Sequence, residues 1–583
     1  MSLAAKEVVI KAVGTATPVF VMSCFRLTSD LCRRMNGQLS TFWWAGQDKE
    51  KGIHWLSWSE CCFSKFEGGL GFRDFDRFNV AMLAKQAWRL ICEPESTLAR
   101  MYKARYHYTD HFLLARQGAR PSWAWQGILQ GRDLLNKGLR WQVGSGTKIN
   151  TLLDPWLPTD PPSSPVLLIG ASLDHPMVSF LLDSNAMEWN LDLLKTIFPP
   201  VTIDKILSIP LPSSPQEDKL IWHYDKSGHY TVKSGYHLLS NGLNLPRNSL
   251  PYFLNTKFWK FLWNIPMPPK LKFFLWRLVR GFLPVKGTLL YKKIISSGLC
   301  PVCCEVNEDF KHCFFDCRIT RELWTLSDLD HIRDMMRESP MDLAWRNLFL
   351  TPHISKNDVA FIVFLFWRIW KGRCKATYGY ILYRSHVLYR QLLAQVEEWR
   401  MAEAQKVQRS EEVQRSIPHS SSGQGPHSRR TDVSFPSEGI LVRFDGATKI
   451  PQGCATGFVG FSGDGNITFA VGKFYQGISD AYISELLAIR DAMKWCLTHN
   501  FFTVVFCGDS QLVIKDVTLK KTSHSRAGAL LEEVHSLLSS FLSVSCHFAP
   551  RSFNRAAHLV AKQALLSGVR LHTDYRSLLV SFL

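Results

Sequence analysis

Three carboxylates in the C-terminal quarter of the chain occupy positions that favour apolar residues. Asp445 lies within an otherwise apolar stretch, Asp509 ends another, and Glu485 shares one face of a predicted helix with Ile489 and Met493. A charge on an apolar face costs free energy unless it is paired or binds a metal, and converging carboxylates repel one another. Divalent cations relieve this repulsion, and oxygen ligands suit Mg²⁺ and Mn²⁺. The three acids therefore predict a Mg²⁺ or Mn²⁺ site if the fold brings them together, whereas each acid alone could simply end a strand or cap a helix.

A second group of residues has the composition of a zinc site. Three cysteines and one histidine follow one another at short spacing: Cys300, Cys303, His312 and Cys317. Three thiolates and an imidazole make a closed tetrahedral Zn²⁺ site, which is structural because no position is left for a substrate. Cys304 and Cys313 lie beside two of these residues, so the choice between neighbouring ligands stays open, as does a chance cluster of buried thiols.

The elements that must position the three carboxylates alternate between strand and helix patterns. The predicted order is strand 439–447, strand 454–462, strand 467–475, helix 480–500, strand 502–509, helices within 510–542, strand 543–550 and helix 554–566. The turn GDGN joins the second and third strands. This order predicts a C-terminal α/β domain in which a mixed five-stranded sheet is flanked by helices.

Within this domain the strings FDGA, SELLAIRDAM, FCGDSQLVI and NRAAHLVAKQA resemble the RNase H fold. They are most similar to the plant subfamily attached to reverse transcriptases of non-LTR (LINE-type) retrotransposons. The resemblance implies that Asp445, Glu485 and Asp509 are catalytic and hold two Mg²⁺ or Mn²⁺ ions. It also implies hydrolysis of the RNA strand of RNA–DNA hybrids.

One position departs from the pattern of that family. The last helix usually supplies a fourth carboxylate just before the Leu-x-Ala step, and His558 stands there. The resemblance therefore implies that His558 is the fourth catalytic and metal-binding residue. Imidazole adds no negative charge and suits Mg²⁺ poorly. We therefore expect modest activity that favours Mn²⁺ over Mg²⁺.

The cysteine cluster and the N-terminal third resemble other parts of the same elements. The cluster, preceded by PPKLKFFLWRL and followed by CRITRELW, is similar to the reverse-transcriptase zinc-binding domain, which implies one structural Zn²⁺ and contact with nucleic acid. The strings FWWAGQDKEKGIHWLSW, EGGLGFRDF and GLRWQVGSG resemble the region that follows the polymerase palm. The chain has no Asp-Asp dipeptide, so we expect neither a palm nor DNA synthesis. The remaining region would hold a duplex or serve as a helical scaffold.

Composition shifts divide the chain into seven predicted segments. In order, these are a thumb-like, mainly helical region 1–160, a connector 161–217 rich in Pro and Ser, the zinc-binding domain 218–330, a helical region 331–404, a disordered linker 405–437, the RNase H-like domain 438–568 and a tail 569–583. Within them we expect a β-hairpin around 226–228 and a helix pair broken at Pro266–Pro269.

The overall composition favours nucleic acid as a partner. The formal net charge is +19, and such an excess of Lys and Arg suits a polyanion, although it is also compatible with a solvated basic surface. The longest apolar run, 359–367, is far shorter than the roughly 20 residues that span a bilayer, so we expect a buried helix there and no membrane contact. The start of the sequence lacks a signal-peptide pattern. We therefore expect an intracellular chain whose 15 cysteines are reduced thiols.

Two functions fit these observations. The first is a hybrid-specific endoribonuclease within a retroelement-derived protein that lacks the polymerase palm. The second is a non-catalytic protein of the same origin that only binds RNA or hybrids. The intact carboxylate trio favours the enzyme, whereas His558 favours the second reading. The sequence leaves the natural substrate, the oligomeric state and the choice between nucleus and cytoplasm open.

Overall fold

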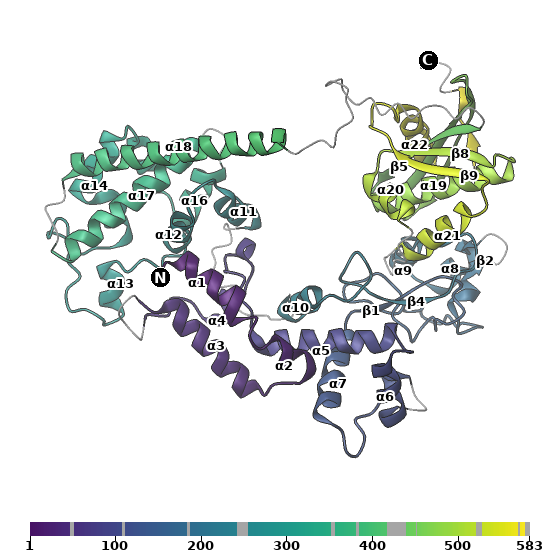
Figure 1. Ribbon diagram of the computed structural model, residues 1–583, viewed down its shortest axis with the longest axis horizontal. Coiled ribbons are helices and arrows are strands. Elements are labelled where there is room, and N and C mark those ends of the chain that lie inside the picture. Colours follow the sequence, from purple (N-terminus) through teal and green to yellow (C-terminus); the bar gives the residue numbers. More distant parts are fainter. Residues whose placement is uncertain are drawn as a thin grey trace. The chain divides into compact units, whose positions relative to one another are not determined.

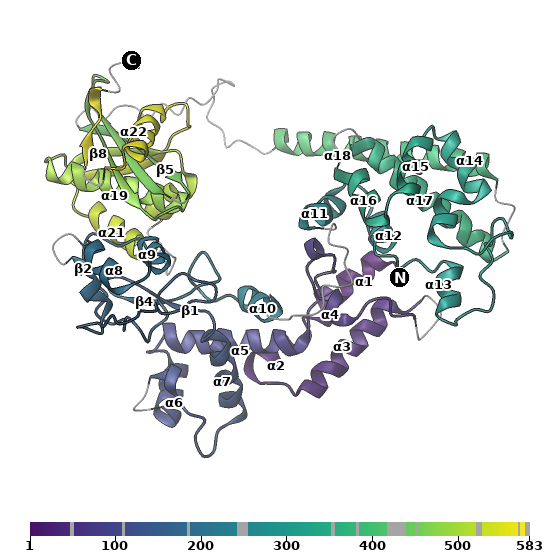
Figure 2. The same cartoon turned by 180° about the vertical axis from the view of Figure 1, so that it is seen from behind.

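The computed structural model describes residues 1–46, 52–107, 111–183, 187–241, 255–350, 356–379, 384–416, 439–450, 452–519, 527–569 and 572–577. They form two compact units, each made from two separate stretches of chain (Figures 1 and 2). The helical unit comprises Met1–Asn79 and Leu239–Gln424, and the sheet unit comprises Val80–Leu238 and Gly425–Leu583.

These unit boundaries differ from the predicted segments. The region predicted for 1–160 divides after residue 79, and the zinc-binding segment predicted for 218–330 divides after residue 238. The physical reason is a long-range contact. Tyr230 is fully buried, and its hydroxyl donates to the carbonyl oxygen of Ala81 over 2.8 Å, so the residues before 239 pack against the start of the sheet unit.

The helical unit packs around one large apolar core. Its helices are α1 (Leu3–Val9), α2 (Val19–Cys24), α3 (Ser29–Trp44), α4 (Trp58–Cys61), α11 (Thr256–Asn264), α12 (Pro269–Val279), α13 (Lys286–Tyr291), α14 (Arg318–Leu326), α15 (Asp330–Glu338), α16 (Met341–Leu350), α17 (Lys356–Thr377) and α18 (Ser385–Ser416). The predicted break in the helix pair is confirmed, because α11 ends at Asn264 and α12 begins at Pro269. Many large aromatic residues lie in this core, as Trp43, Trp276 and Trp345 illustrate.

Helix α17 contains the longest apolar run of the sequence. Val359, Val363 and Phe366 are buried among the other core residues of the helical unit, which confirms the predicted buried helix. Within the part of the chain that the structure describes, no helix is long and apolar enough to cross a membrane.

The first stretch of the sheet unit combines helices with short strands. Its elements are α5 (Phe75–Cys92), α6 (Thr97–Tyr106), α7 (Trp123–Leu135), β1 (Leu139–Gln142), β2 (Leu182–Asp183), β3 (Glu188–Trp189), α8 (Leu191–Ile197), α9 (Pro200–Leu207), β4 (Lys219–Trp222) and α10 (Val232–Asn241). Parts of the predicted connector 161–217 are well packed. Its residues Leu181, Leu194 and Ile206 form a core of their own with Trp156 and Val143, because scattered apolar residues between the prolines meet through two short helices.

The β-hairpin predicted around 226–228 was wrong. A turn does form there, since the Trp222 amide donates to the Gly228 carbonyl over 2.7 Å. However, β4 pairs antiparallel with β1, so that Trp222 lies opposite Leu139. A partner more than 70 residues earlier in the chain cannot be recognised from the local pattern around the turn.

The second stretch of the sheet unit forms a mixed sheet. Its elements are β5 (Ile440–Lys449), β6 (Gly453–Phe461), β7 (Ile467–Gln476), α19 (Ala481–Thr498), β8 (Thr503–Gly508), α20 (Gln511–Thr518), α21 (Gly528–Leu538), β9 (Ser543–Phe548), α22 (Arg555–Ser567) and β10 (Thr573–Asp574). The strand order is β10-β7-β6-β5-β8-β9. Strands β5, β6 and β7 are antiparallel neighbours, whereas β5 with β8 and β8 with β9 are parallel. The predicted five strands are confirmed, and β10 adds a short sixth strand within the predicted tail.

Helices cover both faces of this sheet (Figure 1). Apolar residues of α19, α20 and α21 pack with alternate residues of β5, such as Val442 and Phe444. On the other face, Val560 of α22 packs with Leu441 of β5 and Val459 of β6. Alternation along β5 therefore points successive side chains into two separate cores.

Helix α18 continues into the predicted linker. The linker was expected to begin at 405, but residues 405–416 are helical, and 417–438 lie outside the described residues. Residues 405–416 lack an apolar face, yet Gln, Glu, Lys and Arg have high intrinsic helix propensity and extend a helix that is already nucleated.

A buried polar network joins the two stretches of the sheet unit. The Glu533 carboxylate on α21 is 2% exposed and accepts hydrogen bonds from the amide (3.1 Å) and hydroxyl of Ser213. Lys494 on α19 donates to the same hydroxyl over 2.6 Å, and its ammonium group lies 3.7 Å from Glu533. Arg490 reaches the carbonyl of Leu211 over 3.2 Å. Hydrogen bonds to Arg490, Lys494 and Glu533 therefore hold the segment around 211–213 on the RNase H-like domain.

We predict that Glu533→Ala lowers the free energy of unfolding of the sheet unit by about 3 kcal/mol, because it leaves the buried Arg490, the partly exposed Lys494 and the Ser213 amide without this carboxylate. Chemical denaturation followed by tryptophan fluorescence measures this loss. Glu532→Ala is the matched control on the same helix: Glu532 pairs with Lys219 nearer the surface, so its loss should cost about 1 kcal/mol or less. Equal losses from the two variants would contradict the buried network.

Candidate functional site

The parallel pairing of β5 with β8 brings two of the predicted carboxylates together. Arg443 lies opposite Cys507 in the register, so Asp445 and Asp509 each follow two residues later on neighbouring strands. The parallel alignment therefore brings Asp445, which lies within β5, beside Asp509, which follows the last residue of β8.

Gly446 lets the third carboxylate approach. A Cβ atom at Gly446 would lie 2.5 Å from the carbonyl carbon of Ser484 and 2.6 Å from the amide nitrogen of Glu485, so only glycine permits this contact between β5 and α19. One carboxylate oxygen each from Asp445, Glu485 and Asp509 lies within 4.8 Å of the others. The structure thus brings together the three acids that the sequence singled out.

The pKa values of two carboxyl groups in this cluster are raised. Burial, together with the charges of Asp445 and Asp509, raises the pKa of Glu485 to about 9. Burial also raises the pKa of Asp445, with the charge of Asp509 adding to this effect and the hydrogen bond from His558 opposing it. The Oε2 atom of Glu485 is buried and has no hydrogen-bond partner among the described residues. An unsatisfied buried oxygen between two further carboxylates fits a hard divalent cation such as Mg²⁺ or Mn²⁺.

His558 lies beside this cluster but is not one of its converging members. Its Nδ1 atom lies 2.7 Å from Oδ2 of Asp445, and its side chain is 63% exposed. Asn554 places it there: the buried Asn554 side chain donates to the carbonyl of Phe444 over 2.8 Å and anchors the start of α22 on β5. The geometry therefore gives His558 a hydrogen bond to one carboxylate, and its role as a metal ligand stays a prediction.

Arg551 is a residue of this site that sequence reasoning missed. Its Nε atom lies 3.3 Å from Oδ2 of Asp509, while the side chain is 94% exposed. It follows Pro550 in the loop between β9 and α22, and the only available signal was a cation where three acids converge. Gly446 and Asn554 were missed in the same way, because their roles depend on contacts between distant elements.

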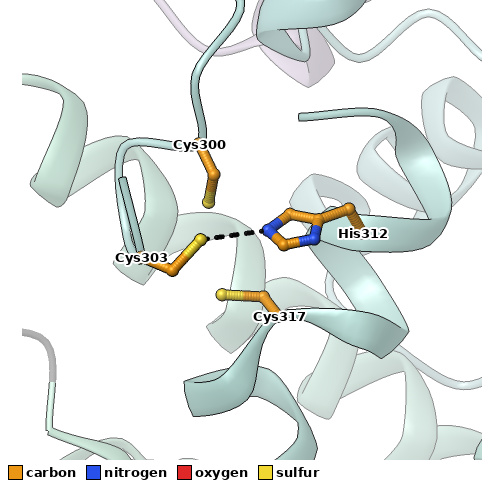
Figure 3. Close-up of side chains that lie close together, drawn as sticks. All are labelled: Cys300, Cys303, His312 and Cys317. Atoms are coloured by element: carbon orange, nitrogen blue, oxygen red, sulfur yellow. Dashed lines mark hydrogen bonds between the residues drawn. The ribbon is translucent and has the colours of Figure 1, made fainter. Parts of the chain in front are cut away.

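The second predicted cluster also comes together (Figure 3). One ligand atom each from Cys300, Cys303, His312 and Cys317 lies within 4.8 Å of the others, and the Cys303 sulfur lies 3.3 Å from Nε2 of His312. Ligands of a tetrahedral zinc ion with bonds of about 2.0–2.3 Å lie roughly 3.5–3.8 Å apart, so the four donors fit Zn²⁺.

The neighbouring cysteines point elsewhere. Cys304 is exposed and has a positive φ of 58°, which ends the turn that carries Cys300 and Cys303. Cys313 is buried in the apolar core of the helical unit. Among the described residues, the geometry therefore favours the ligand set of Cys300, Cys303, His312 and Cys317 over either alternative.

Two short elements position the zinc ligands. The π-helix η6 (His312–Asp316) carries His312, whose amide donates to the carboxylate of Asp309 over 2.6 Å. Cys317 then caps the start of α14. A hydrogen bond from Cys300 lowers the pKa of Cys317, and the same bond raises the pKa of Cys300. A divalent cation that binds both sulfurs would displace this shared proton to solvent and leave two thiolates as ligands.

A buried ion pair supports this module from behind. Arg373 on α17 donates to both oxygens of the Glu308 carboxylate, at 2.7 and 2.6 Å, and Glu308 is fully buried. The same carboxylate accepts a hydrogen bond from the Lys286 amide over 2.6 Å. Arg373 thus ties the loop before His312 to the core helix, which fixes one half of the ligand set.

Comparisons with known proteins give family matches over the ranges that contain the two clusters. Residues 230–324 match the family model of a zinc-binding domain in reverse transcriptase, and residues 443–564 match a reverse-transcriptase-like model. An uncharacterized mitochondrial protein of Arabidopsis thaliana is 40% identical over 152 residues, which cover 26% of this chain and 99% of that protein. A protein of the same plant that is provisionally named a ribonuclease H protein is 25% identical over 409 residues, and the match covers 65% of this chain and 61% of that protein.

Solved structures are similar to the C-terminal part of the chain. The crystal structure of RNase H1 from the halophilic archaeon Halobacterium salinarum is 28% identical, with a TM-score of 0.21, and the match covers 22% of this chain and 98% of that one. The structure of LC11-RNase H1 in complex with an RNA/DNA hybrid is 14% identical, with a TM-score of 0.21, and the match covers 22% of this chain and 97% of that one.

The order of the modules is as informative as each match. A zinc-binding segment known from reverse transcriptases precedes an RNase H-like domain in one chain, and both carry converging ligand sets. The chain therefore belongs to the retrotransposon-derived proteins that carry the zinc-binding and RNase H-like domains of reverse transcriptases, and its curated relatives are plant proteins.

Proposed function

We propose that this protein is a metal-dependent endoribonuclease that cleaves the RNA strand of RNA–DNA hybrids. The observation that carries the proposal is the convergence of Asp445, Glu485 and Asp509 within 4.8 Å. Three ionised carboxylates this close together repel one another, and a bound divalent cation offsets that repulsion.

Each residue has a distinct task in this proposal. Asp445, Glu485 and Asp509 would hold two Mg²⁺ or Mn²⁺ ions, which supply the charge that activates water and stabilises a leaving oxygen. His558 orients the Asp445 carboxylate through its 2.7 Å hydrogen bond. Arg551 is exposed beside Asp509, so its guanidinium can contact a phosphate of the scissile strand while it remains near the cluster.

We expect Asp445→Asn to reduce cleavage of a labelled RNA–DNA hybrid at least a hundredfold. Loss of a carboxylate that holds the cation removes several kcal/mol of transition-state stabilisation, and about 1.4 kcal/mol corresponds to tenfold in rate. Product release is followed on a gel in Mg²⁺ and in Mn²⁺. The control is Asp464→Asn, which removes an exposed carboxylate in the turn between β6 and β7 and should leave the rate unchanged.

Equal cleavage by the wild-type protein and Asp445→Asn would overturn the nuclease proposal. Hybrid binding without any cleavage would instead support a non-catalytic nucleic-acid-binding protein. Zinc content measured on the same sample shows whether the zinc-binding module is loaded when either result is obtained.

We predict that His558→Asp raises cleavage in Mg²⁺ by roughly tenfold and narrows the preference for Mn²⁺. The change adds a carboxylate beside Asp445, and partners next to metal ligands typically alter affinity or activity by about that factor. The preference is measured as the ratio of initial rates in the two metals. His547→Asp, which adds the same charge on exposed β9, serves as the control, and no gain from His558→Asp would count against the prediction.

The pKa of Glu485 yields a further prediction for protein in buffer without Mg²⁺ or Mn²⁺. Because the folded pKa of about 9 exceeds the usual value of 4.5, the folded state holds a proton that the unfolded state has lost between these pH values. The contribution of this group to stability is therefore present below about pH 4.5 and is lost as pH rises towards 9.

Glu485→Gln removes this dependence and should stabilise the metal-free protein by on the order of 1–2 kcal/mol at pH 8, with a smaller gain at pH 5. Denaturant titrations at the two pH values measure the difference, with Glu532→Gln as a control that leaves the carboxylate cluster intact. A gain that is equal at both pH values would contradict the assignment of the proton to Glu485.

A further inference from the structure

A basic cavity of about 410 Å³ lies between the starts of α14 and α18 in the helical unit. Four of its lining residues carry a basic group, and they are Arg318, Arg384, His386 and Arg390. Arg318 begins α14, whereas the other three come from the start of α18 and the residue before it. Basic residues that lie more than 60 positions apart in the sequence thus line the same cavity.

The arginines of this cavity have no counter-charge of their own. In the described part of the chain, no carboxylate lies within ion-pair distance of Arg318, Arg384 or Arg390. Among the described lining residues, Glu322 is the one acid, and its carboxylate accepts a hydrogen bond from the Ser385 hydroxyl over 2.7 Å. Three guanidinium groups against a single carboxylate leave an excess of positive charge that an anion would neutralise.

Guanidinium groups suit phosphate better than other anions of this size. Each presents several N–H donors in a planar fork that matches two phosphate oxygens. The cavity volume exceeds that of a single phosphate, and Ile319 and Val387 add apolar surface to its wall. A phosphate with an attached sugar therefore fits both the charge and the lining.

The arginine side chains, rather than the helix end, carry the site. Cys317 is the N-cap residue of α14 and makes no side-chain capping hydrogen bond, whereas the three arginines supply the charge that the cavity presents. This arrangement also links the cavity to the zinc cluster: Cys317 is one of the four converging donors, and Arg318 is the next residue along the chain.

We propose that this cavity binds the sugar–phosphate backbone of a nucleic acid strand, and that zinc ligation through Cys317 holds Arg318 in place for it. The cavity belongs to the helical unit, so the proposal is independent of cleavage in the sheet unit. It assigns a backbone-binding site to named residues of the zinc-binding module, where contacts to phosphate supply affinity but no sequence preference.

The test is the salt dependence of binding of a short fluorescent RNA strand to the full-length chain, measured by anisotropy. All proteins carry Asp445→Asn so that the probe stays intact. Combined Arg318→Gln, Arg384→Gln and Arg390→Gln should lower the slope of log affinity against log salt by roughly 2, because each contact to a single-strand phosphate contributes about 0.7. The same three positions changed to Lys keep the charge and should keep most of the slope.

The matched control removes three exposed arginines elsewhere in the helical unit, through Arg33→Gln, Arg346→Gln and Arg400→Gln. It should change the slope by less than about 1. Equal effects of the two triple variants would overturn the proposal, because total charge rather than the cavity would then set the affinity. Unchanged zinc content and an unchanged melting curve show that the cavity variant is folded.

Two further arms test the ligand and the link to zinc. Unlabelled RNA should displace the probe, whereas a morpholino strand of the same sequence, which lacks charged phosphates, should not. Displacement by the morpholino, or stronger displacement by polyglutamate of equal charge, would overturn backbone recognition. Removal of zinc by a chelator should reduce the slope of the protein with an intact cavity to that of the Gln variant, and an unaffected slope would overturn the role of Cys317.

Discussion

The parallel pairing of β5 with β8 is the interaction on which the RNase H-like domain depends. It places Asp445 and Asp509 side by side on two central strands of the sheet, where their negative charges repel each other. The surrounding structure opposes this repulsion. Gly446 admits α19, the two apolar cores hold helices against both faces of the sheet, and Asn554 anchors α22. A cluster that is unfavourable by itself is thus maintained by packing elsewhere, as is common where a site must receive a cation.

The zinc cluster follows the same physical principle with softer ligands. Cys300 and Cys317 share a proton in a space where both thiols would have to ionise to bind a metal, and the buried pair of Glu308 and Arg373 holds the loop before His312 in place. The difference lies in the environment. The carboxylates lie beside an exposed arginine, whereas the thiols are enclosed between a turn and the start of a helix. An open site suits a substrate, and a closed one suits a structural ion.

The sequence predicted the local features well and the long-range ones poorly. Strands β5 to β9 and helix α19 follow from alternation and helical spacing, and Asp445, Glu485 and Asp509 could be singled out because each interrupts an apolar pattern. Arg551 and Gly446 could not, since neither interrupts a pattern and their roles arise only when β8, β9 and α19 come together. The pairing of β4 with β1 escaped for the same reason. The prolines and serines of 161–217 concealed apolar residues such as Leu194 and Ile206, whose spacing becomes regular only within two short helices.

The buried network around Glu533 has a topological consequence. The sheet unit is built from Val80–Leu238 and Gly425–Leu583, so the stretch Leu239–Gln424 leaves it and returns to it like an inserted domain. The two stretches of the sheet unit are joined by the contacts among Ser213, Lys494 and Glu533 and not only by the connecting chain. The RNase H-like domain is therefore one part of a unit built from two stretches of chain, not an independent domain joined only through a linker. A break in the backbone between α18 and β5 would leave the two stretches of the sheet unit associated, as in fragment complementation. An insertion or deletion between α18 and β5 would change the length of the covalent connection without removing the contacts that join the two stretches.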